Sequence, residues 1–388
     1  MMRLALLVTG LLSAQEWTDR AEYDLALSVR AQPAPQARMV LLDQWKQRYP
    51  GSPMRIARAE LTLGAAQMLG DTTRILDASR DLVAADANSF PGLYWIAALA
   101  PGQTASTKQL AEAENAARKL MKGADAFFAT PAGKAHAVQK KQVLAMAHRT
   151  LGWVEWRRNS VDAALVELQT SLELNPRNAE ASAWTGTILA PNPDRAKKTQ
   201  AIWHLARASF LDGDGSLPAQ QRRDVRSLLE TAYTSHHGAL DGLEEVGAKT
   251  REVVMPPETF QIESATEVGQ RKADEALAQA NPQLFEWVKI RRRLAGANGE
   301  AEYRKLEGSP LLTLKGYVIR CDGGAKPNEV VVGVQDSSIE EIVLKLDSRA
   351  AKCPDIGLAL EFEGLPVAFV KEPFRMTVGV EVKAVRGW

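Results

Sequence analysis

The spacing of small and apolar residues between Ala145 and Pro176 constrains the fold of this chain more than any other feature. Gly152 follows Leu151, and the residues at offsets of 12, 16, 19 and 24 from this glycine are Ala164, Leu168, Ser171 and Pro176. A small residue on one helix lets a second helix approach closely, and a proline ends that second helix. The pattern therefore predicts an antiparallel helix pair, with its second helix over 160–174.

Weaker copies of the pattern flank this pair. Gly64 is followed at the same offsets by Leu76, Arg80, Val83 and Asn88, and Gly186 by the triplet Ala201, Leu205 and Ala208, whose offsets are longer by three. Ala98 heads another copy, and a triplet that starts at Ala37 reads as the second helix of a first, truncated repeat. Tandem helix pairs of this size predict a helical solenoid.

These offsets resemble those of the tetratricopeptide (TPR) repeat family over residues 37–211. The resemblance implies an all-α solenoid in which Leu151, Gly152, Ala164, Leu168, Ser171 and Pro176 pack one repeat. The family's usual aromatic residue, three positions after the small residue, is replaced by Glu155, and the connections vary in length. We therefore expect an irregular superhelix.

The C-terminal part of the chain has a different character, because short β-type segments replace the helical pattern after Gly308. They predict five strands, over 312–321, 329–335, 341–346, 357–362 and 374–385. Five strands of this length suit a small closed barrel, and an OB-like fold is the first expectation. The chain is thus expected to be multidomain: a signal peptide over 1–14, TPR-like repeats over 15–250, a helical hairpin linker over 251–308 and a five-stranded OB-like β-barrel over 309–388.

Two short motifs lie near the end of the chain, GxxxxFEG at 357–364 and KxPF at 371–374. With the order of repeats, hairpin and barrel, they resemble a group of uncharacterised exported bacterial proteins, in which these motifs surround the fourth and fifth strands of the barrel. The resemblance covers most of the chain and implies no particular activity.

The first residues have the order of a signal peptide. Arg3 precedes an apolar run over 4–12, and the small residue Ala14 follows it. This order predicts cleavage near Ala14 and a periplasmic or secreted protein. A buried first helix is the alternative, and a cytoplasmic scaffold follows if the segment 1–14 is retained. No later run approaches the length of a membrane-spanning helix, so we expect no membrane span.

The two cysteines, Cys321 and Cys353, both lie in the predicted barrel. In an exported protein this placement favours a disulfide within a small domain. Two buried free thiols are the alternative.

The net charge argues against nucleic-acid binding, and the lack of catalytic motifs in the sequence argues against an enzyme. The net charge is +1, and from residue 309 onward ten Lys and Arg face eleven Asp and Glu, so we expect no nucleic acid partner. We find no nucleophile elbow, P-loop, dinucleotide fingerprint or zinc-protease motif in the sequence. The prediction is a non-enzymatic protein without a cofactor.

The histidines and one acidic loop are interpreted structurally. His236 and His237 precede a glycine, which suits the end of a helix better than a metal pair. The loop 212–216 lacks the Gly and Glu that an EF-hand needs at positions six and twelve. His148 and His204 are isolated from other metal-ligand residues in the sequence and are interpreted as packing residues, so no metal site is predicted.

A binding surface follows from the TPR resemblance. The geometry of the family places one set of residues at or near the concave side of the clearest repeat: Met146, Arg149, Trp153, Trp156 and Arg157. Trp and Arg dominate binding hot spots. The alternative places the two tryptophans in the core; because they lie three positions apart, at most one is expected to be fully buried.

These expectations lead to a prediction of function. The chain is predicted to be an exported, non-enzymatic protein–protein interaction scaffold, which holds a peptide or a partner helix in its concave groove. The alternative is a cell-envelope accessory or hydrolytic protein that uses the barrel to bind a glycan or a lipid.

Overall fold

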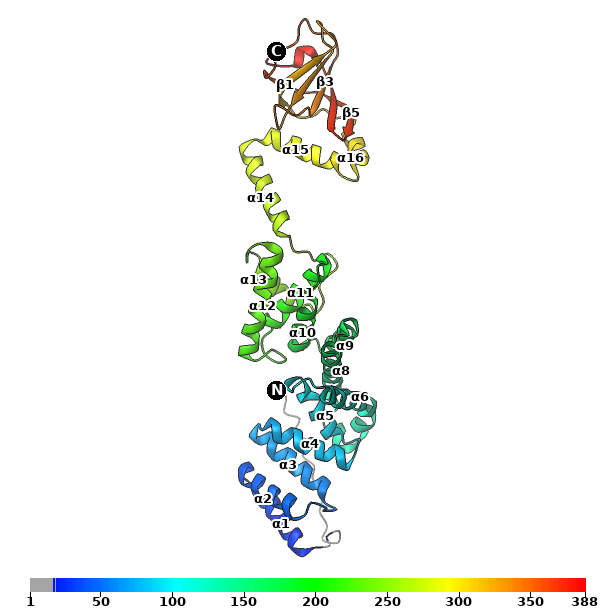
Figure 1. The fold of residues 1–388 in the computed structure, drawn as a ribbon, viewed down its shortest axis with the longest axis vertical. Coiled ribbons are helices and arrows are strands. Elements are labelled where there is room, and N and C mark those ends of the chain that lie inside the picture. The colour runs from blue at the N-terminus through cyan, green and yellow to red at the C-terminus, as the bar shows by residue number, and fades with distance from the viewer. Residues whose placement is uncertain (1–16, 18) are drawn as a thin grey trace. The chain divides into compact units, whose positions relative to one another are not determined.

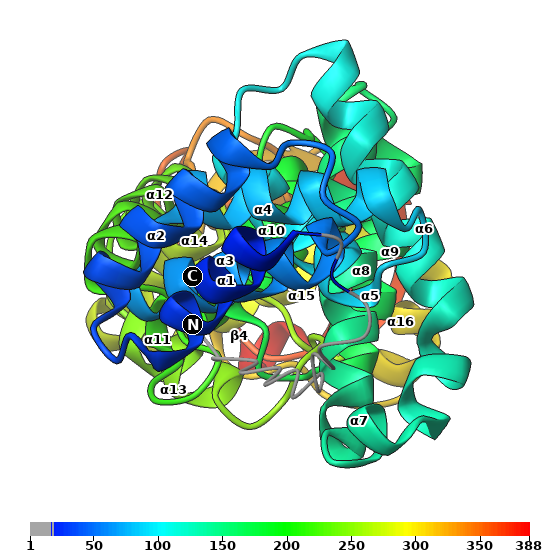
Figure 2. The same ribbon diagram turned by 90° about the horizontal axis from the view of Figure 1, so that it is seen from below.

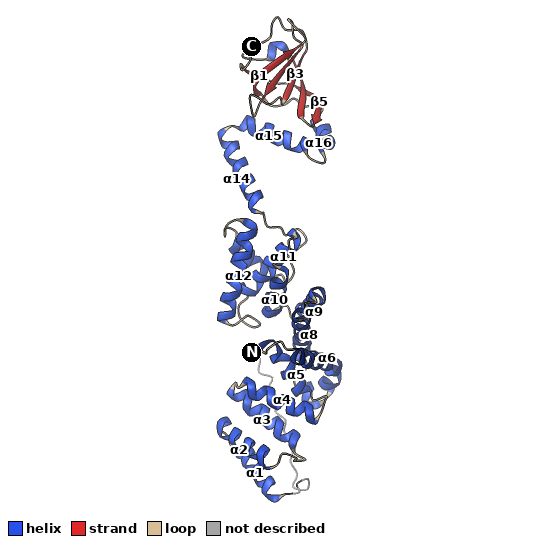
Figure 3. Cartoon of the chain, viewed as in Figure 1, coloured by secondary structure: helices blue, strands red, loops and turns tan. Residues whose placement is uncertain are grey.

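The structure is a computed structural model that describes residue 17 and residues 19–388. The signal peptide expected over 1–14 lies outside the described residues. The chain divides into two compact units, Met1–Ile262 and Glu263–Trp388. Figure 3 shows that the described part of the first unit is helical and that the strands belong to the second.

The helical unit consists of consecutive short helices separated by tight turns (Figure 1). The helices are α1 Arg20–Ala31, α2 Pro35–Arg48, α3 Arg55–Leu69, α4 Thr72–Ala85, α5 Phe90–Leu99, α6 Thr107–Ala129, α7 Pro131–Lys134, α8 Lys140–Arg157, α9 Val161–Leu174, α10 Ala179–Leu189, α11 Arg195–Phe210, α12 Ala219–His237 and α13 Leu243–Thr250, with short 3₁₀ turns η2 Ala100–Gly102 and η3 Ala137–Gln139.

Neighbouring helices pack as hairpins: α1 with α2, α3 with α4, α5 with α6, α8 with α9, and α10 with α11. Side-chain caps begin several of them, including Asp71 before α4 and Asp194 before α11. Helices α12 and α13 both pack on α11 at the C-terminal end of the series. In Figure 2 the first hairpin, in dark blue, lies nearest the viewer.

Ion pairs between hairpins reveal the period of the repeat. Four of them join residues 31 to 35 positions apart: Arg74–Asp43, Lys46–Asp81, Arg80–Glu112 and Arg149–Glu180. A TPR repeat is about 34 residues long, so equivalent positions of adjacent repeats meet at this separation. The helical unit has a TPR-like fold.

The predicted packing of the clearest repeat is observed in α8 and α9. A Cβ atom on Gly152 would lie 2.7 Å from Cγ of Leu168 and 3.2 Å from the carbonyl oxygen of Ala164. Leu151 is buried as well, and Ser171 donates a hydrogen bond to the carbonyl oxygen of Ala145 at 2.7 Å. Pro176 follows the end of α9. The same close approach recurs in the next hairpin, where Gly186 faces Leu205.

Two details of the predicted repeats are wrong. A Cβ atom on Gly64 would touch nothing within 4 Å, whereas Ala66 is fully buried, with Ala78 and Leu82 at the same offsets of 12 and 16. The register of this copy is therefore shifted by two positions. The first repeat is not truncated either, because α1 precedes α2 and packs against it.

Gly152→Ala is expected to lower the free energy of unfolding of the helical unit by about 1–3 kcal/mol, because the new methyl group overpacks a buried contact. Gly64→Ala is the matched control: the position is open, so the better helix propensity of Ala should raise stability by about 0.5–1 kcal/mol. Urea unfolding measured by far-UV circular dichroism compares the two variants. Equal effects would contradict the shifted register.

The C-terminal unit holds three helices and one mixed sheet. Its elements are α14 Ala265–Ala280, α15 Pro282–Ala295, α16 Gly299–Leu306, β1 Leu314–Asp322, β2 Glu329–Gly333, β3 Ile342–Leu346, β4 Ala359–Phe362, β5 Leu365–Lys371, β6 Phe374–Val380 and the 3₁₀ turn η4 Val382–Ala384. The strand order is β4-β1-β2-β3-β6-β5, and all neighbouring pairs are antiparallel except β3 with β6.

The prediction of five strands is wrong, because the described sheet has six. The additional strand, β5, is an edge strand that pairs only with β6, and it contains Pro366. A proline is tolerated at a sheet edge but reads as a break in the sequence. The described sheet is open, because β4 and β5 form its two edges. The predicted closed barrel is therefore not observed.

Helix α15 belongs to the core of the sheet. Trp287 and Leu294 of this helix are fully buried in the same cluster as Val318, Leu344 and Met376. The hairpin expected as a linker over 251–308 therefore belongs, from Glu263 onward, to the second compact unit.

Candidate functional site

The five residues predicted to line a groove all lie on α8, but they differ in accessibility. Met146 and Trp153 are 9% and 5% exposed and belong to the core. Trp153 packs against Ala100, Leu110 and Ala113, which come from η2 and α6. Their assignment to a binding surface is therefore wrong, because α6 and its preceding turn cover this side of α8.

Arg149 joins three helices. Its Nη1 atom donates to Oε2 of Glu180 in α10 at 2.5 Å, and Nη2 donates to the carbonyl oxygen of Ala98 in α5 at 3.4 Å. The guanidinium carbon also lies 5.8 Å from the ring centroid of Trp184, within cation–π range. The side chain is only 16% exposed, so Arg149 positions neighbouring helices rather than presenting a free charge.

The positive charge of Arg149 also affects Tyr94 of α5. Burial raises the pKa of the Tyr94 hydroxyl, and the positive charge of Arg149 opposes that rise. Tyr94 is 9% exposed, so it stays a neutral core residue beside this arginine at physiological pH.

Three side chains of this region remain accessible. Trp156 and Trp184 are half-buried and pack against the same cluster as Trp153. Arg157 is exposed, and within residues 19–388 it makes no ion pair. We call Trp156, Arg157 and Trp184 the tryptophan surface. As expected, only one of the two tryptophans on α8 is fully buried.

The sequence interpretation missed Glu180 and Trp184. Glu180 lies 31 positions after Arg149, which is close to one repeat period. Comparing positions one repeat apart on the same side of the helices would have found this pair. The partial burial of Trp184 depends on the packing of α8 and α10, which the spacing alone does not give.

His148, His236 and His237 have structural roles, and His204 is buried in α11. His148 lies 2.7 Å from Glu167 across the α8–α9 hairpin. His236 and His237 end α12, and the capping residue Gly238 has a φ of 92°, the left-handed conformation of a helix C-cap. Across residues 19–388, no three His, Cys, Asp or Glu side chains gather in a way that could hold a metal ion.

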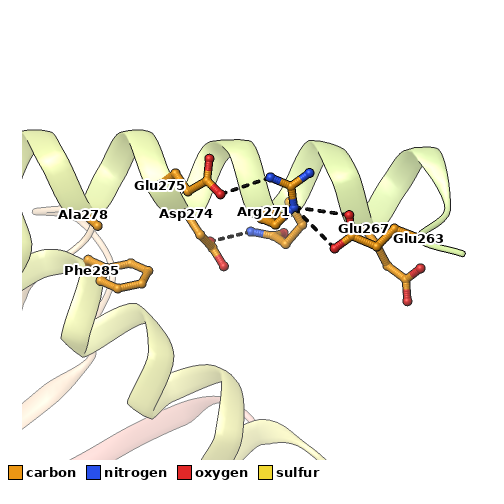
Figure 4. Close-up of a pocket in the computed structure, with 8 residues that line it drawn as sticks. Glu263, Glu267, Arg271, Asp274, Glu275, Ala278 and Phe285 are labelled. Atoms are coloured by element: carbon orange, nitrogen blue, oxygen red, sulfur yellow. Dashed lines mark hydrogen bonds and ion pairs between the residues drawn. The ribbon is translucent and has the colours of Figure 1, made fainter. Parts of the chain in front are cut away.

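The described part of the chain includes two surface depressions of different size. One lies on α14 and is open to solvent; Arg271 there pairs with Glu263 and Glu275 at 3.2 and 3.1 Å, and Phe285 of α15 closes one end (Figure 4). The other, between α4 and α6, has a volume of about 10 Å³, too small for a ligand. Neither resembles a deep substrate pocket.

Cys321 and Cys353 are joined by a disulfide, with their Cα atoms 6.0 Å apart. Cys321 lies in β1 and Cys353 in the loop between β3 and β4. The bridge ties this loop to the sheet. None of the helices between Arg20 and Leu306 is both long and apolar enough to cross a membrane.

No protein-family model matches the sequence, and no curated protein matches it. Solved structures that match part of the chain include the following two. The MamA RS-1 ArsTM double mutant shares 13% identity over 54% of this chain and 96% of its own, with a TM-score of 0.33. The thermophilic TPR protein TTC0263 of Thermus thermophilus shares 16% identity over 55% of this chain and 97% of its own, with a TM-score of 0.26. These low scores add no argument about function.

Proposed function

We propose that the helical unit is a non-enzymatic protein-interaction scaffold and that a peptide or a helix of the partner contacts the tryptophan surface. The observation that carries this proposal is the placement of Trp156 and Trp184. Both rings pack against one buried cluster with part of their surface accessible, and Arg157, the next residue after Trp156 on α8, is exposed and makes no ion pair within residues 19–388. Accessible Trp and Arg side chains on a rigid support are the typical anchors of protein interfaces.

The surface is held in a fixed geometry. The ion pair between Arg149 and Glu180 links α8 to α10, and therefore links the helices that carry Trp156 and Trp184. Fixed anchors lose little conformational entropy on binding, which favours affinity.

Photo-crosslinking tests this surface. A photoreactive residue at Arg157 is expected to form adducts with one specific protein, whereas the same residue at Val166, 64% exposed on α9, should not. In the chain that carries the photoreactive residue at position 157, the additional substitution Trp156→Ala should reduce adduct formation at least about tenfold, because it removes an anchor side chain. Circular dichroism checks that the variant is folded. Equal labelling from both positions would contradict the proposal.

We infer that the chain is exported to the periplasm or secreted. The disulfide between Cys321 and Cys353 supports an oxidising compartment, and the order of charge, apolar run and small residue up to Ala14 supports a cleaved signal peptide. Cell fractionation with N-terminal sequencing is expected to find a mature chain that begins at Gln15. A cytoplasmic chain that retains the segment 1–14 would contradict this inference.

We further infer that the six-stranded sheet is an open, OB-like module in which β4 and β5 together take the place of one bent strand, and that it serves as a second binding module or a docking foot. Only Glu363 and Gly364 separate the two strands, so their facing ends lie within about 11 Å of each other. The parallel pairing of β3 with β6 supports this arrangement.

A further inference from the structure

The segment 251–262, which follows α13, lies on the helical unit as an extended strap. It contains neither helix nor strand, and Pro256 and Pro257 interrupt it. Its exposed side chains include those of Val253 and Met255, which are 44% and 40% exposed. We call residues 251–262 the strap.

Side chains of α11 and α12 bind the main chain of the strap. Arg207 donates from Nη1 to the carbonyl oxygens of Thr250, at 2.5 Å, and Val253, at 3.2 Å. Trp203 donates from Nε1 to the carbonyl oxygen of Val254 at 3.1 Å, and His236 to that of Ile262 at 3.0 Å. Because these hydrogen bonds are made to backbone carbonyl groups, they can form with peptides of different sequence.

Three side chains of the strap supply the apolar contacts. Val254 packs against Leu168, Leu172 and Ala181. The ring of Phe260 meets that of Trp203 edge-on, with centroids 4.6 Å apart. Ile262 is 4% exposed in the cluster of α11, α12 and α13. The contacts therefore select an aliphatic residue, an aromatic residue six positions later and an aliphatic residue two positions beyond.

Arg207 is an unusual residue for a helix interior. It is 3% exposed, burial lowers its pKa, and it has no carboxylate partner within residues 19–388. The carbonyl oxygens of Thr250, Val253 and Pro176 take the place of a carboxylate. The two terminal nitrogen atoms of the guanidinium donate to these carbonyl groups, whereas Nε is buried without a hydrogen-bond partner within residues 19–388. A buried guanidinium that donates to carbonyl groups is suited to hold a peptide main chain.

We propose that this surface of α9–α12 is a peptide-binding site, which the strap occupies in cis. Its ligand is an extended segment of a partner protein that carries the same pattern of aliphatic and aromatic residues. The tethered strap competes at a high effective concentration, so a partner gains access when the strap leaves. The site adjoins the tryptophan surface at Trp184, which packs against the same buried cluster as Val254. The contacts that hold the strap come from residues other than Trp156 and Arg157, so the proposal stands independently of the proposed function.

A labelled synthetic peptide of residues 251–261 tests the proposal. The full mature chain is prepared as wild type and with Val254→Ser/Phe260→Ser, which removes two anchors and leaves the deeply buried Ile262 in place. Fluorescence anisotropy is expected to show that the variant binds the peptide about tenfold more tightly than wild type does, because the tethered competitor is lost. A peptide that carries the same two substitutions should not bind.

A matched variant in the strap, Glu252→Ser/Glu258→Ser, changes two exposed positions and should bind the peptide as weakly as wild type does. Trp156→Ala/Arg157→Ala should leave peptide binding unchanged, which separates this proposal from the proposed function. A folded release variant that does not bind the peptide at millimolar concentration would overturn the proposal.

Hydrogen exchange of the wild-type chain gives a second measurement if the release variant does not fold. The strap amides are expected to exchange much faster than those of α11, because the strap opens without unfolding of the helices. Exchange of both at the same rate, that of global unfolding, would overturn the proposal as well, since the strap could not leave a folded site.

Discussion

Glu341→Ala is expected to lower the free energy of unfolding of the C-terminal unit by about 3–5 kcal/mol, the usual cost of removing one partner from a buried charged network. Glu341 is 1% exposed and lies directly before β3. Its Oε1 atom accepts from Nε1 of Trp287 at 3.3 Å and from Nη1 of Arg291 at 3.0 Å. One carboxylate thus ties α15 to the sheet.

The other oxygen of Glu341 holds the end of β2. Oε2 accepts from the backbone nitrogen atoms of Val334 and Gln335 at 2.7 and 2.5 Å. Removing the carboxylate leaves these donors and the indole of Trp287 without their acceptor, whereas Arg291, whose side chain is 35% exposed, keeps a hydrogen bond to Oε1 of Gln335 at 2.6 Å. Each buried donor that loses its partner costs about 1–3 kcal/mol, so the effects combine to a large loss.

Urea unfolding, monitored by hydrogen exchange of the backbone amides of β2 and β3, measures the free energy of unfolding of the C-terminal unit alone. Glu381→Ala is the matched control, because Glu381 is exposed in the same unit and its side chain makes no ion pair within residues 19–388. The control should change stability by less than about 0.5 kcal/mol. A loss as small as this for Glu341→Ala would show that the network contributes nothing to the fold.

The repeat could be predicted from the sequence because its determinants are local. Gly152 and Leu168 lie on consecutive helices, and the short turn that joins these helices must bring the two residues together. The change to strands after Gly308 is equally local. The register of the copy at Gly64 cannot be read from spacing alone, because Gly64 and Ala66 are both small and only burial distinguishes them.

Strand β5 and the burial of Trp153 could not be predicted, for two different physical reasons. An edge strand with one paired side shows no clear alternation, and Pro366 gives the signal of a turn. Trp153 is covered by η2 and α6, which come from a distant, earlier part of the chain, so its burial is a tertiary effect. The hydrogen bond that joins Glu341 to Trp287, 54 positions earlier, leaves no local pattern in the sequence.

The helical unit is expected to lose about 3 kcal/mol of stability as the pH falls from 6.5 to 4, through His204 alone. Burial, aided by the positive charge of Arg207, lowers the pKa of His204 from 6.5 to about 4. The side chain is 1% exposed, and its Nδ1 atom has no hydrogen-bond partner in the part of the chain that the structure describes. The folded state therefore holds the neutral imidazole.

The direction of the effect follows from where the proton binds. Above pH 6.5 the imidazole is neutral in both states, and His204 adds no pH dependence. Between pH 6.5 and 4 the unfolded chain binds a proton that the folded chain excludes, so acid favours unfolding by about 1.4 kcal/mol per pH unit. Below pH 4 the folded state is protonated too, and the slope from this group ends.

Urea unfolding of wild type and His204→Gln at pH 7 and pH 4.5 isolates this histidine, because all other titrating groups are shared. The stability difference between the two proteins should shift by about 2.5 kcal/mol in favour of the variant on acidification. Hydrogen exchange of α10–α12 assigns the loss to the helices around His204. Stability curves that stay parallel from pH 7 to 4.5 would mean that the imidazole takes up its proton equally well in the folded chain, and α11 would then have to admit water beside Arg207.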